Sequence, residues 1–284
     1  MTTDRPSQRA GHPGTALVTG AARGIGRATV DALAGRGWRV VAGVRDLEAA
    51  RHAGLDRNGV HLVALDVTVP AQVRDAVREA EALAGGALDA VVLNAGYALI
   101  GAVEDVDPDE VRAVFETNAL GALAVVQASL PAMREAGRGA VVFVSTVGAG
   151  LPTPLLGAYR ASKAALNAFA EVLSMETRPY GIRVARVEPG MVASEFSKAT
   201  RLSGSIAHAE GPYTLLLTGF RGAMGRWRAQ YETPAARVAD AIADLIEDPD
   251  PPHVVPIGDD VAHLAGGDED HVLAFLGIEW PRRA

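Results

Sequence analysis

Short apolar runs alternate with longer helical patterns along most of this chain, and no other feature constrains its fold as strongly. The runs that read as strands lie at 16–19, 38–44, 60–65, 88–93, 140–144, 182–187 and 253–257. Helical patterns lie between them, at 70–84, at about 109–136 with Pro131 bending or dividing it, and up to about 177. Such alternation implies a parallel sheet with helices on both faces. The sequence therefore predicts one α/β domain with a doubly wound parallel sheet of about seven strands.

A glycine-rich turn follows the first predicted strand. Gly20, Gly24 and Gly26 stand between an apolar run and a helical pattern, with Ile25 before the last glycine. Glycines in such a turn let the backbone approach a pyrophosphate, and the start of the helix adds N–H donors and a positive dipole end. Because the strand before and the helix after are both present, the turn predicts a phosphate site.

Several motif residues converge on one edge of the predicted sheet. Residues that come just after predicted strands are Gly20, Asp66, Asn94, Ser145 and Pro189. Open parallel sheets bind their ligands at the carboxyl ends of the strands. The sequence therefore predicts one composite site at that edge.

Tyr159 and Lys163 are four residues apart in a predicted helix. Residues at this spacing share a face, about 6 Å apart along the axis. A phenol with a pKa near 10 transfers protons poorly at neutral pH, and a neighbouring cation can lower that pKa by roughly 1–3 units. The pair therefore predicts a tyrosine that acts as a general acid or base.

Four motifs together resemble the single-domain short-chain dehydrogenase/reductase family. They are Thr19-Gly20-x-x-x-Gly24-Ile25-Gly26, Asn94-Ala95-Gly96, Tyr159-x-x-x-Lys163 and Pro189-Gly190, in the order and at the spacings usual for that family. The resemblance covers about residues 14–262, and it implies a Rossmann-type sheet and hydride transfer with a nicotinamide cofactor. The pattern is closest to the hydroxysteroid and retinol dehydrogenase branch and to microbial carbonyl reductases.

The resemblance also implies roles for individual residues. Tyr159 would exchange a proton with the substrate oxygen, Lys163 would lower the tyrosine pKa and hold the nicotinamide ribose, and Asn118 would hold a water that links Lys163 to solvent. Asp66 and Val67 would line the adenine, and Asn94, Ala95 and Gly96 the middle of the cofactor. The segment that closes over the nicotinamide would supply Pro189, Gly190, Val192 and Ser194.

The catalytic hydroxyl departs from the family pattern and leaves two candidates. Counting thirteen positions back from Tyr159 reaches Thr146, with Ser145 just before it. An insertion of one residue between 147 and 154 would give the role to Ser145. Adjacent strand residues point to opposite faces, so we expect one of the two to face the substrate, with Ser145 slightly favoured.

Charge at the end of the second strand indicates the cofactor. Val44 stands where an NAD-type enzyme usually has an acid, and Arg45 follows; Arg23 lies in the glycine turn. Two guanidinium groups suit a 2′-phosphate, although Asp46 could still reach the ribose. The sequence therefore favours NADP(H) over NAD(H).

A substrate region is expected at about 195–231. This stretch is rich in large apolar residues and could form a lid, a pair of helices packed on the domain, or a subunit contact. Candidate substrate residues, some of them from other segments by resemblance, are Tyr97, Leu151, Phe196, Tyr213 and Phe220.

Composition excludes several other function classes. The net charge of −7 without a basic run argues against nucleic acid and anionic membranes as partners, and no apolar stretch approaches the ~20 residues of a membrane span. The chain has no cysteine, which is compatible with the cytoplasm, and its seven histidines show no metal-ligand spacing. We expect a disordered tail at 1–13, a C-terminal extension at 263–284 and, by resemblance, a homodimer or homotetramer.

The leading functional hypothesis is an NADPH-dependent reductase of a small, largely apolar carbonyl compound. Two alternatives keep the fold: a non-redox reaction with NADP(H), such as cyclisation, dehydration or epimerisation, and a catalytically silent cofactor-binding protein. The shifted hydroxyl position is the feature that favours the non-redox reaction, and the complete set Asn118, Tyr159 and Lys163 argues against the silent protein.

Overall fold

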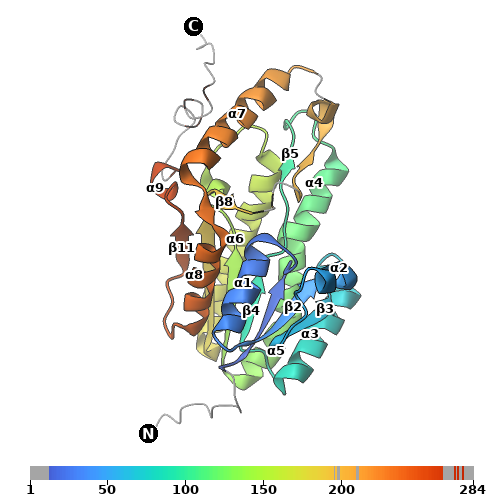
Figure 1. The fold of residues 1–284 in the computed structure, drawn as a ribbon, viewed down its shortest axis with the longest axis vertical. Helices are drawn as coiled ribbons and strands as arrows, with labels where there is room; N and C mark the ends of the chain where they lie inside the picture. The colour runs from blue at the N-terminus through green and yellow to red at the C-terminus, as the bar shows by residue number, and fades with distance from the viewer. Residues whose placement is uncertain are drawn as a thin grey trace.

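Seven parallel strands form the central sheet of the computed structural model (Figure 1). Their order across the sheet is β11-β7-β6-β4-β1-β2-β3. The strands are β1 (Thr15–Thr19), β2 (Arg39–Val44), β3 (Val60–Ala64), β4 (Ala90–Leu93), β6 (Gly139–Val144), β7 (Ile182–Pro189) and β11 (Val254–Ile257). The predicted doubly wound sheet is confirmed, and every apolar run read as a strand falls on one of them.

The structure describes residues 13–264 apart from 195, 197, 198, 209 and 210, together with residues 272, 274 and 277. The expected tail at 1–13 therefore lies outside the described residues except for Pro13. Most of the expected extension at 263–284 and the first residue of the expected substrate region, Glu195, also lie outside them.

Helices cover both faces of the sheet, as the alternation predicted. On one face α1 (Gly24–Gly35) and α8 (Ala235–Glu247) pack side by side (Figure 1). The other face carries α3 (Pro70–Ala84), α5 (Gly121–Ala136) and α6 (Gly157–Thr177). Because both faces are buried, the strands are apolar at successive positions rather than alternate ones.

The other elements are short or lie at the edges of this layered core. They are α2 (Leu47–His52), α4 (Pro108–Phe115), α7 (Thr214–Tyr231), α9 (Val261–Leu264), a π-helical turn (Glu116–Leu120), 3₁₀ turns (Val147–Gly150, Arg178–Tyr180, Gly204–His208) and the two-residue strands β5 (Leu99–Ile100), β8 (Val192–Ala193), β9 (Arg201–Leu202) and β10 (Thr233–Pro234). β5 pairs with β9, and β8 pairs with β10.

The long helix expected at 109–136 is present, but Pro131 does not divide it. The irregularity is the π-helical turn between α4 and α5, and α5 continues through Pro131. A proline inside a helix costs about 3 kcal/mol locally. Val125, Val126 and Met133 are buried against the sheet, and this packing holds the helix together.

The continuous helical stretch Pro108–Ala136 is long and apolar enough, by length and composition alone, to cross a membrane, with a mean hydropathy of 1.3. Our expectation that no apolar stretch approaches that length is therefore wrong. In the structure 44% of its most apolar window is buried, so packing on the sheet accounts for much of its apolar composition.

The expected substrate region contains one long helix, α7, over a small separate core. Leu217, Phe220 and Ala223 of α7 pack there with Leu155 and Ile206. This core lies at the end of the molecule that also carries β5 and α4 (Figure 1). The region is therefore a packed layer in its described part, one of the arrangements weighed from the sequence.

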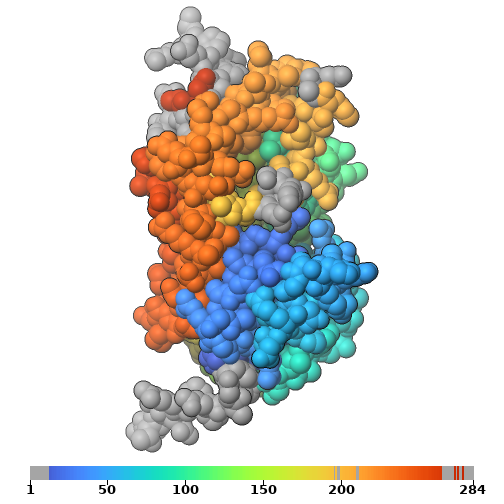
Figure 2. Space-filling model, in the orientation of Figure 1, coloured from blue at the N-terminus to red at the C-terminus, as the bar shows by residue number. Residues whose placement is uncertain are grey.

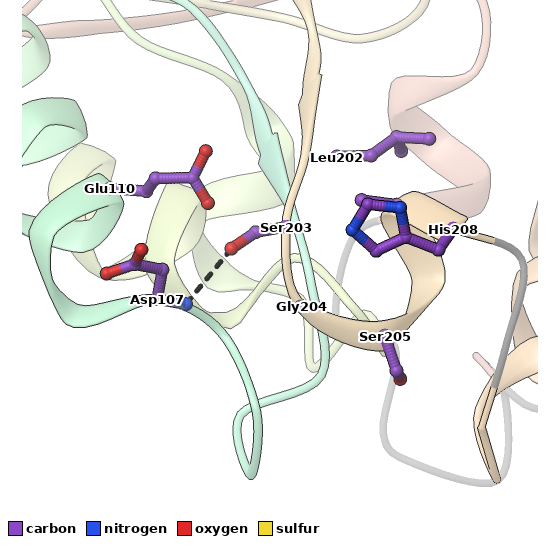
Figure 3. A pocket seen from close by; sticks show the side chains of 8 residues that line it. Asp107, Glu110, Leu202, Ser203, Gly204, Ser205 and His208 are labelled. Atoms are coloured by element: carbon purple, nitrogen blue, oxygen red, sulfur yellow. Dashed lines mark hydrogen bonds between the residues drawn. The ribbon is translucent and has the colours of Figure 1, made fainter.

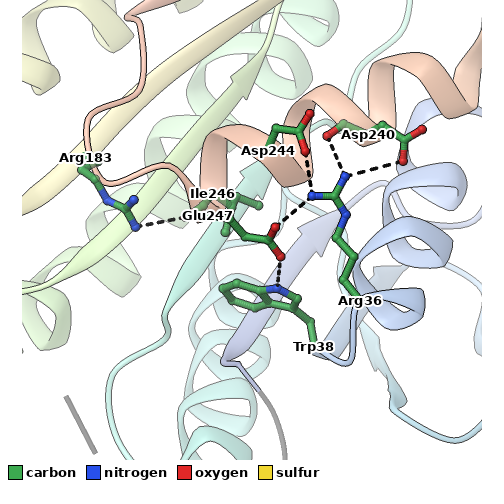
Figure 4. Close-up of polar contacts among 7 residues, drawn as sticks. All are labelled: Arg36, Trp38, Arg183, Asp240, Asp244, Ile246 and Glu247. Carbon is green, nitrogen blue, oxygen red and sulfur yellow. Dashed lines mark hydrogen bonds and ion pairs between the residues drawn. The ribbon is translucent and has the colours of Figure 1, made fainter. Parts of the chain in front are cut away.

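A polar cluster fastens α8 to the loop after α1 (Figure 4). Arg36 Nη1 donates to Asp244 Oδ1 at 2.7 Å and to Glu247 Oε2 at 2.9 Å. Trp38 Nε1 donates to the other oxygen of Glu247 at 2.9 Å. These contacts join segments far apart in the sequence on the α1 face of the sheet.

Candidate active site

The carboxyl ends of β1 and β4 are joined by two buried or partly buried polar side chains. Thr19 Oγ1 donates to Val92 O at 3.3 Å and accepts from the N–H groups of Asn94 at 3.0 Å and Ala95 at 3.1 Å. Asn94 Nδ2 donates to the carbonyl oxygens of Thr19 at 3.0 Å and Gly20 at 3.1 Å. The Asn94 amide nitrogen, expected at the cofactor, thus fixes the start of the glycine turn.

The glycine turn is packed closely against its neighbours. Gly20 and Gly24 have positive φ angles of 64° and 56°, a region that favours glycine. A Cβ on Gly26 would lie 2.3 Å from Gly20 O, and one on Gly24 would lie 3.3 Å from the Cβ of Ser194. The predicted phosphate turn and the predicted nicotinamide segment therefore meet here. In Figure 2 the yellow atoms near β8 lie between blue atoms of α1 and orange atoms of α7.

The start of α1 and the end of β2 carry the predicted cationic groups. Arg23 is the N-cap residue of α1, and its side chain does not cap the helix. Arg23 and Arg45 are both exposed. Asp46, the competing acid, caps α2: its Oδ1 accepts from Ala49 N at 2.9 Å. Asp46 therefore already has a partner, which leaves the two guanidinium groups as the cationic side chains beside the turn.

Asp66 and Val67 follow β3 as predicted but face different surroundings. Asp66 Oδ1 accepts from Thr68 N at 2.9 Å and from Thr68 Oγ1 at 2.7 Å. The Val67 side chain is buried in the core, where a Cβ on Gly121 would lie 2.6 Å from it. Val67 can thus contribute to a ligand site through its main chain.

Lys163 is a buried cation on α6, with 4% of its surface exposed. Its Nζ donates to Val144 O at 2.8 Å, at the end of β6. A Cβ on Gly96 would lie 3.5 Å from the same nitrogen. Burial lowers the pKa of the Lys163 ammonium to about 8, because desolvation disfavours the charged form. An ammonium has three N–H donors, so two remain beside the bond to Val144.

Tyr159 lies one helical turn before Lys163, and its ring is 6.1 Å from that of Phe196 between centroids. Burial raises the pKa of the Tyr159 phenol above its ordinary value of 10. The expectation that Lys163 lowers this pKa is therefore wrong for this structure. The cause is desolvation, which disfavours the phenolate, so the Tyr159 side chain is held as a neutral phenol.

Asn118 sits in the π-helical turn and is fully buried. Its Oδ1 accepts from Tyr97 N at 3.0 Å, while its Nδ2 donates to Tyr97 O at 2.9 Å and to Ser162 Oγ at 3.0 Å. Both amide donors are thus in use, and the side chain locks Tyr97 to α6. The second lone pair of Oδ1 is left to accept a hydrogen bond from the expected water.

The two hydroxyl candidates after β6 differ in their partners. Thr146 Oγ1 accepts from Gly148 N at 3.1 Å, as the cap of the following 3₁₀ turn, and donates to Pro189 O at 3.2 Å. Ser145 Oγ is buried and has no hydrogen-bond partner among the described residues. Thr146 is therefore committed to local structure, whereas Ser145 has an unused hydroxyl.

The segment from Pro189 to Ser194 begins at the end of β7 and is held by backbone bonds to residues 233 and 257. Gly190 N donates to Ile257 O at 2.9 Å, and Thr233 N donates to Met191 O at 2.9 Å. Val192 is buried in β8, and Ser194 Oγ accepts from Phe196 N at 3.4 Å. The predicted nicotinamide segment thus contains a short strand, β8, which pairs with β10.

The expected substrate residues separate into two groups. Tyr97, Leu151 and Phe196 belong to segments that contact Asn118, Gly148 and Tyr159, respectively. The structure places Phe220 in the small core under α7. Tyr213 packs at that core, and its hydroxyl bonds Glu104.

A cavity lies partly within the expected substrate region at 195–231. It has a volume of about 410 Å³ and is lined by Asp107, Glu110, Leu202, Ser203, Gly204, Ser205, Ala207 and His208 (Figure 3). None of these lining residues was named as a candidate from the sequence, although six of them fall in that region. Among the described residues, no group of three or more histidine, aspartate or glutamate residues could hold a metal ion.

Sequence reasoning also missed residues that support the site. Thr19 was read as part of a motif, without a role for its hydroxyl, and Ser162 was not identified. Arg201 was missed too; its guanidinium carbon lies 4.7 Å from the centroid of the Tyr97 ring. Ser162 could have been found as a polar residue between Tyr159 and Lys163. The position of Arg201 beside Tyr97 could not, because it depends on the pairing of β9 with β5.

Comparison with known proteins identifies the family. Residues 14–203 match the sequence profile described as short chain dehydrogenase. The chain is 30% identical over 266 residues to the oxidoreductase BOA17 of Botryotinia fuckeliana (strain B05.10), covering 93% of this chain and 95% of that protein. The chain therefore belongs to the short-chain dehydrogenase family and is an oxidoreductase of that family.

Solved structures share its fold. A short-chain dehydrogenase from Streptomyces avermitilis superposes with a TM-score of 0.79 at 31% identity, covering 93% of this chain and 96% of that one. A short chain dehydrogenase from Burkholderia cenocepacia J2315 in complex with NADP gives 0.71 at 27% identity, covering 93% and 98%. A 3-ketoacyl-(acyl-carrier-protein) reductase from Brucella melitensis complexed with NADH gives 0.72 at 25% identity, covering 87% and 97%. The last two of these structures hold NADP and NADH, respectively.

The junction at Thr19 predicts a stability difference between two conservative variants. Thr19→Val keeps the shape but removes the hydroxyl that serves three backbone groups. Leaving such a group unpaired costs roughly 1–3 kcal/mol when it is buried. Two of the three bonds are only partly buried, so we expect a total loss of about 2–4 kcal/mol, below the full sum. Thr19→Ser keeps the hydroxyl and should lose less than about 1 kcal/mol. Urea unfolding measures both; a Thr19→Val variant as stable as the wild type would contradict this role.

Lys163 predicts a pH-dependent gain in stability on its removal. Its pKa is about 8 when folded and 10.5 when free, so its charged form opposes folding by roughly 3 kcal/mol at neutral pH. The penalty is complete below pH 8 and disappears by pH 10.5, because the unfolded chain binds the extra proton between these values. Lys163→Met should therefore raise Tm by several degrees at pH 7 and by little at pH 10.5.

The control for this experiment is Arg78→Met, since Arg78 is exposed on α3. Its Tm difference from the wild type should not vary between pH 7 and 10.5. A lower Tm of Lys163→Met at pH 7, or a difference that is the same at both pH values, would show that the buried charge does not oppose folding.

Proposed function

We propose that this protein is an NADPH-dependent oxidoreductase that interconverts a carbonyl group and a secondary alcohol on a small, largely apolar substrate. The observation that carries the proposal is the buried Lys163 cation one helical turn from the Tyr159 phenol, at the carboxyl edge of the sheet. The residue after its Val144 partner is Ser145, whose hydroxyl is buried and unused within the described residues. Since NADPH usually drives reductions in cells, we favour the conversion of ketone to alcohol.

The residues at this edge fit a dinucleotide cofactor. The turn from Gly20 to Gly26 and the start of α1 would hold the pyrophosphate with backbone N–H groups. Glycine keeps this turn tight, since a Cβ on Gly20 or Gly26 would lie within 2.9 Å of protein atoms. Lys163 would bind the nicotinamide ribose with its two remaining donors, and the segment 189–194 would lie against the nicotinamide. When bound, the cofactor supplies a hydride to the substrate carbon or accepts one from it.

Tyr159 would donate a proton during reduction. Burial raises its pKa, so the phenol stays protonated at physiological pH and its proton is available. As the carbonyl oxygen gains charge, Tyr159 Oη transfers its proton to that oxygen, which becomes the alcohol hydroxyl. The phenolate that remains is stabilised by the Lys163 cation, whose attraction is strong where water is excluded. In the oxidation direction the same proton returns to Tyr159.

Ser145 would serve the same carbonyl oxygen as a hydrogen-bond donor. Its hydroxyl has no partner among the described residues, while the Thr146 hydroxyl already bonds Gly148 and Pro189. Polar groups buried without a partner are rare in native structures. This difference supports Ser145 as the catalytic hydroxyl and so weakens the sequence argument for a non-redox reaction.

NADP(H) is favoured over NAD(H) by the charges around the end of β2. Arg45 and Arg23 are exposed there, and Asp46 is held as the cap of α2. Guanidinium groups bind phosphate through paired hydrogen bonds. A ribose 2′-phosphate would therefore find cations rather than a carboxylate at this position.

A homodimer or homotetramer remains our expectation for the assembly. Support comes from Val172 and Met175 of α6, which expose 48% and 65% of their surface. Large apolar side chains on one helix suit a contact with a second copy of the chain.

The test of the proposed function is NADPH oxidation at 340 nm against a panel of ketones, aldehydes and quinones. General acid–base groups contribute about 10²–10⁴-fold to rates, so Tyr159→Phe should lower kcat by at least about 100-fold. Ser145→Ala should lower it by a similar factor, whereas Thr146→Ser, which keeps the structural hydroxyl, should stay within about threefold of the wild type.

Two outcomes would contradict this assignment. No oxidation by the wild type, with NADPH binding confirmed by calorimetry, would move the non-redox reaction to the front. A Ser145→Ala variant that keeps the activity of the wild type would exclude Ser145 as the catalytic hydroxyl and leave Thr146 as the candidate.

Cofactor choice predicts a selective effect of Arg45. Arg45→Ala should raise the Kd for NADPH about tenfold, as one charge-assisted phosphate contact of about 1.5–3 kcal/mol is lost, and leave the Kd for NADH unchanged. Arg51→Ala is the matched control, because Arg51 is exposed on α2 and pairs with Asp56. Calorimetric titration of both cofactors measures this; tighter NADH binding by the wild type would refute the NADPH preference.

A further inference from the structure

Asp260 is a fully buried carboxylate outside the predicted site. It lies between β11 and α9, and its Oδ2 accepts two hydrogen bonds. One comes from the backbone N–H of Met191 at 2.7 Å, and the other from Trp227 Nε1 at 3.1 Å. A single oxygen thus joins the segment after Pro189 to helix α7.

Two glycines make room for this carboxylate. A Cβ on Gly190 would lie 1.9 Å from Asp260 Oδ1, and one on Gly258 would lie 2.4 Å from it. Neither distance is possible for real atoms, so the backbone at both positions is shaped around the side chain. Asp260 Oδ1 and Thr233 Oγ1 are themselves buried without a partner in the described part of the chain.

The other hydrogen bonds of Gly190 and Met191, the residues beside Asp260, are made by the backbone. Met191 also accepts a bond from Thr233 N, and Gly190 donates to Ile257 O. These contacts lie along the main chain, whereas the Asp260 bond is the side-chain contact that fixes the Met191 N–H. Without it that partly buried N–H would be left unpaired, which is unfavourable.

On the other side, Trp227 of α7 belongs to an aromatic group with Tyr231 of the same helix and His263 of α9. Its ring lies 4.5 Å from that of Tyr231 and 6.1 Å from that of His263 between centroids. α7 also covers the small core that contains Leu217 and Phe220. The Trp227 bond therefore connects Asp260 to helix α7 and to the small core that this helix covers.

We propose that Asp260 is a positioning residue that shapes the segment 189–193 for the cofactor and couples this segment to helix α7. The inference rests on the proposed function, because it takes that segment as part of the nicotinamide site. It predicts that NADPH binding is felt in α7 through the bond from Trp227 to Asp260.

The test combines NADPH titration by calorimetry with hydrogen exchange of the backbone amides. Asp260→Ala removes both bonds and should weaken NADPH binding at least tenfold and speed exchange of the Met191 amide. Asp260→Asn keeps an oxygen that can accept both bonds and should stay within about threefold of the wild type. Asp259→Ala is the matched control, since the neighbouring Asp259 is exposed and pairs with Arg237.

A second variant tests the coupling by itself. Trp227→Phe keeps an aromatic ring but removes the Nε1–H donor. In the wild type, NADPH should slow exchange in residues 214–231; in Trp227→Phe this slowing should be lost, while the Met191 amide remains protected. This variant also tests the proposal if Asp260→Ala does not fold.

The outcomes separate this inference from the proposed function. If the wild type does not bind NADPH, the proposed function fails, and exchange of Met191 in the ligand-free variants still tests the positioning role. If NADPH binds but Asp260→Ala leaves both its Kd and the Met191 exchange unchanged, Asp260 has no positioning role. If Asp260→Asn behaves like Asp260→Ala, or α7 is protected equally in Trp227→Phe, the hydrogen-bond coupling is refuted.

Discussion

The burial of one cation, Lys163, is the constraint on which the arrangement of the site depends. A charged ammonium with 4% exposure opposes folding unless the surroundings supply acceptors. Here the acceptor that the structure supplies is a carbonyl oxygen at the end of β6, Val144 O. The carboxyl end of a parallel sheet presents such groups beyond the last ladder bond, so the fold itself provides the place where a buried lysine can be held.

The neighbours of Lys163 are positioned by contacts that do not involve its charge. Asn118 bonds both backbone groups of Tyr97 and reaches Ser162 on α6, one residue before the lysine. The π-helical turn places Asn118 at this point, between two regular helices. π-helical turns of this kind occur frequently at functional sites. Desolvation by this packing lowers the Lys163 pKa and raises that of Tyr159, so one physical cause acts in opposite directions on the two groups.

Sequence patterns predicted the sheet and the edge at which the motif residues gather, because these depend on local composition. A strand such as β6 is buried on both faces and therefore reads as an uninterrupted apolar run. The glycines at 20, 24 and 26 are readable for the same reason, since each is required by backbone geometry at its own position. The sequence could not predict which of the Ser145 and Thr146 hydroxyls has a hydrogen-bond partner. That difference depends on the bond from Thr146 to Pro189, far along the chain.

The expectations that failed have a common physical origin in packing between distant segments. Spacing alone places Lys163 beside Tyr159, but the direction of the tyrosine pKa depends on how much water the surrounding segments exclude. Pro131 is a helix breaker by local rules, yet buried neighbours such as Met133 keep α5 intact.

The environment of Asp260, beside α7, also depends on packing between distant segments. The neighbouring pair Asp259-Asp260 gives no local sign that one carboxylate is exposed and the other fully buried. The difference arises because Gly190 and Gly258 leave space on one side while Met191 and Trp227 supply donors on the other. Where a site is completed by hydrogen bonds between distant segments, its geometry follows from the fold, and motif residues mark its edge rather than its full extent.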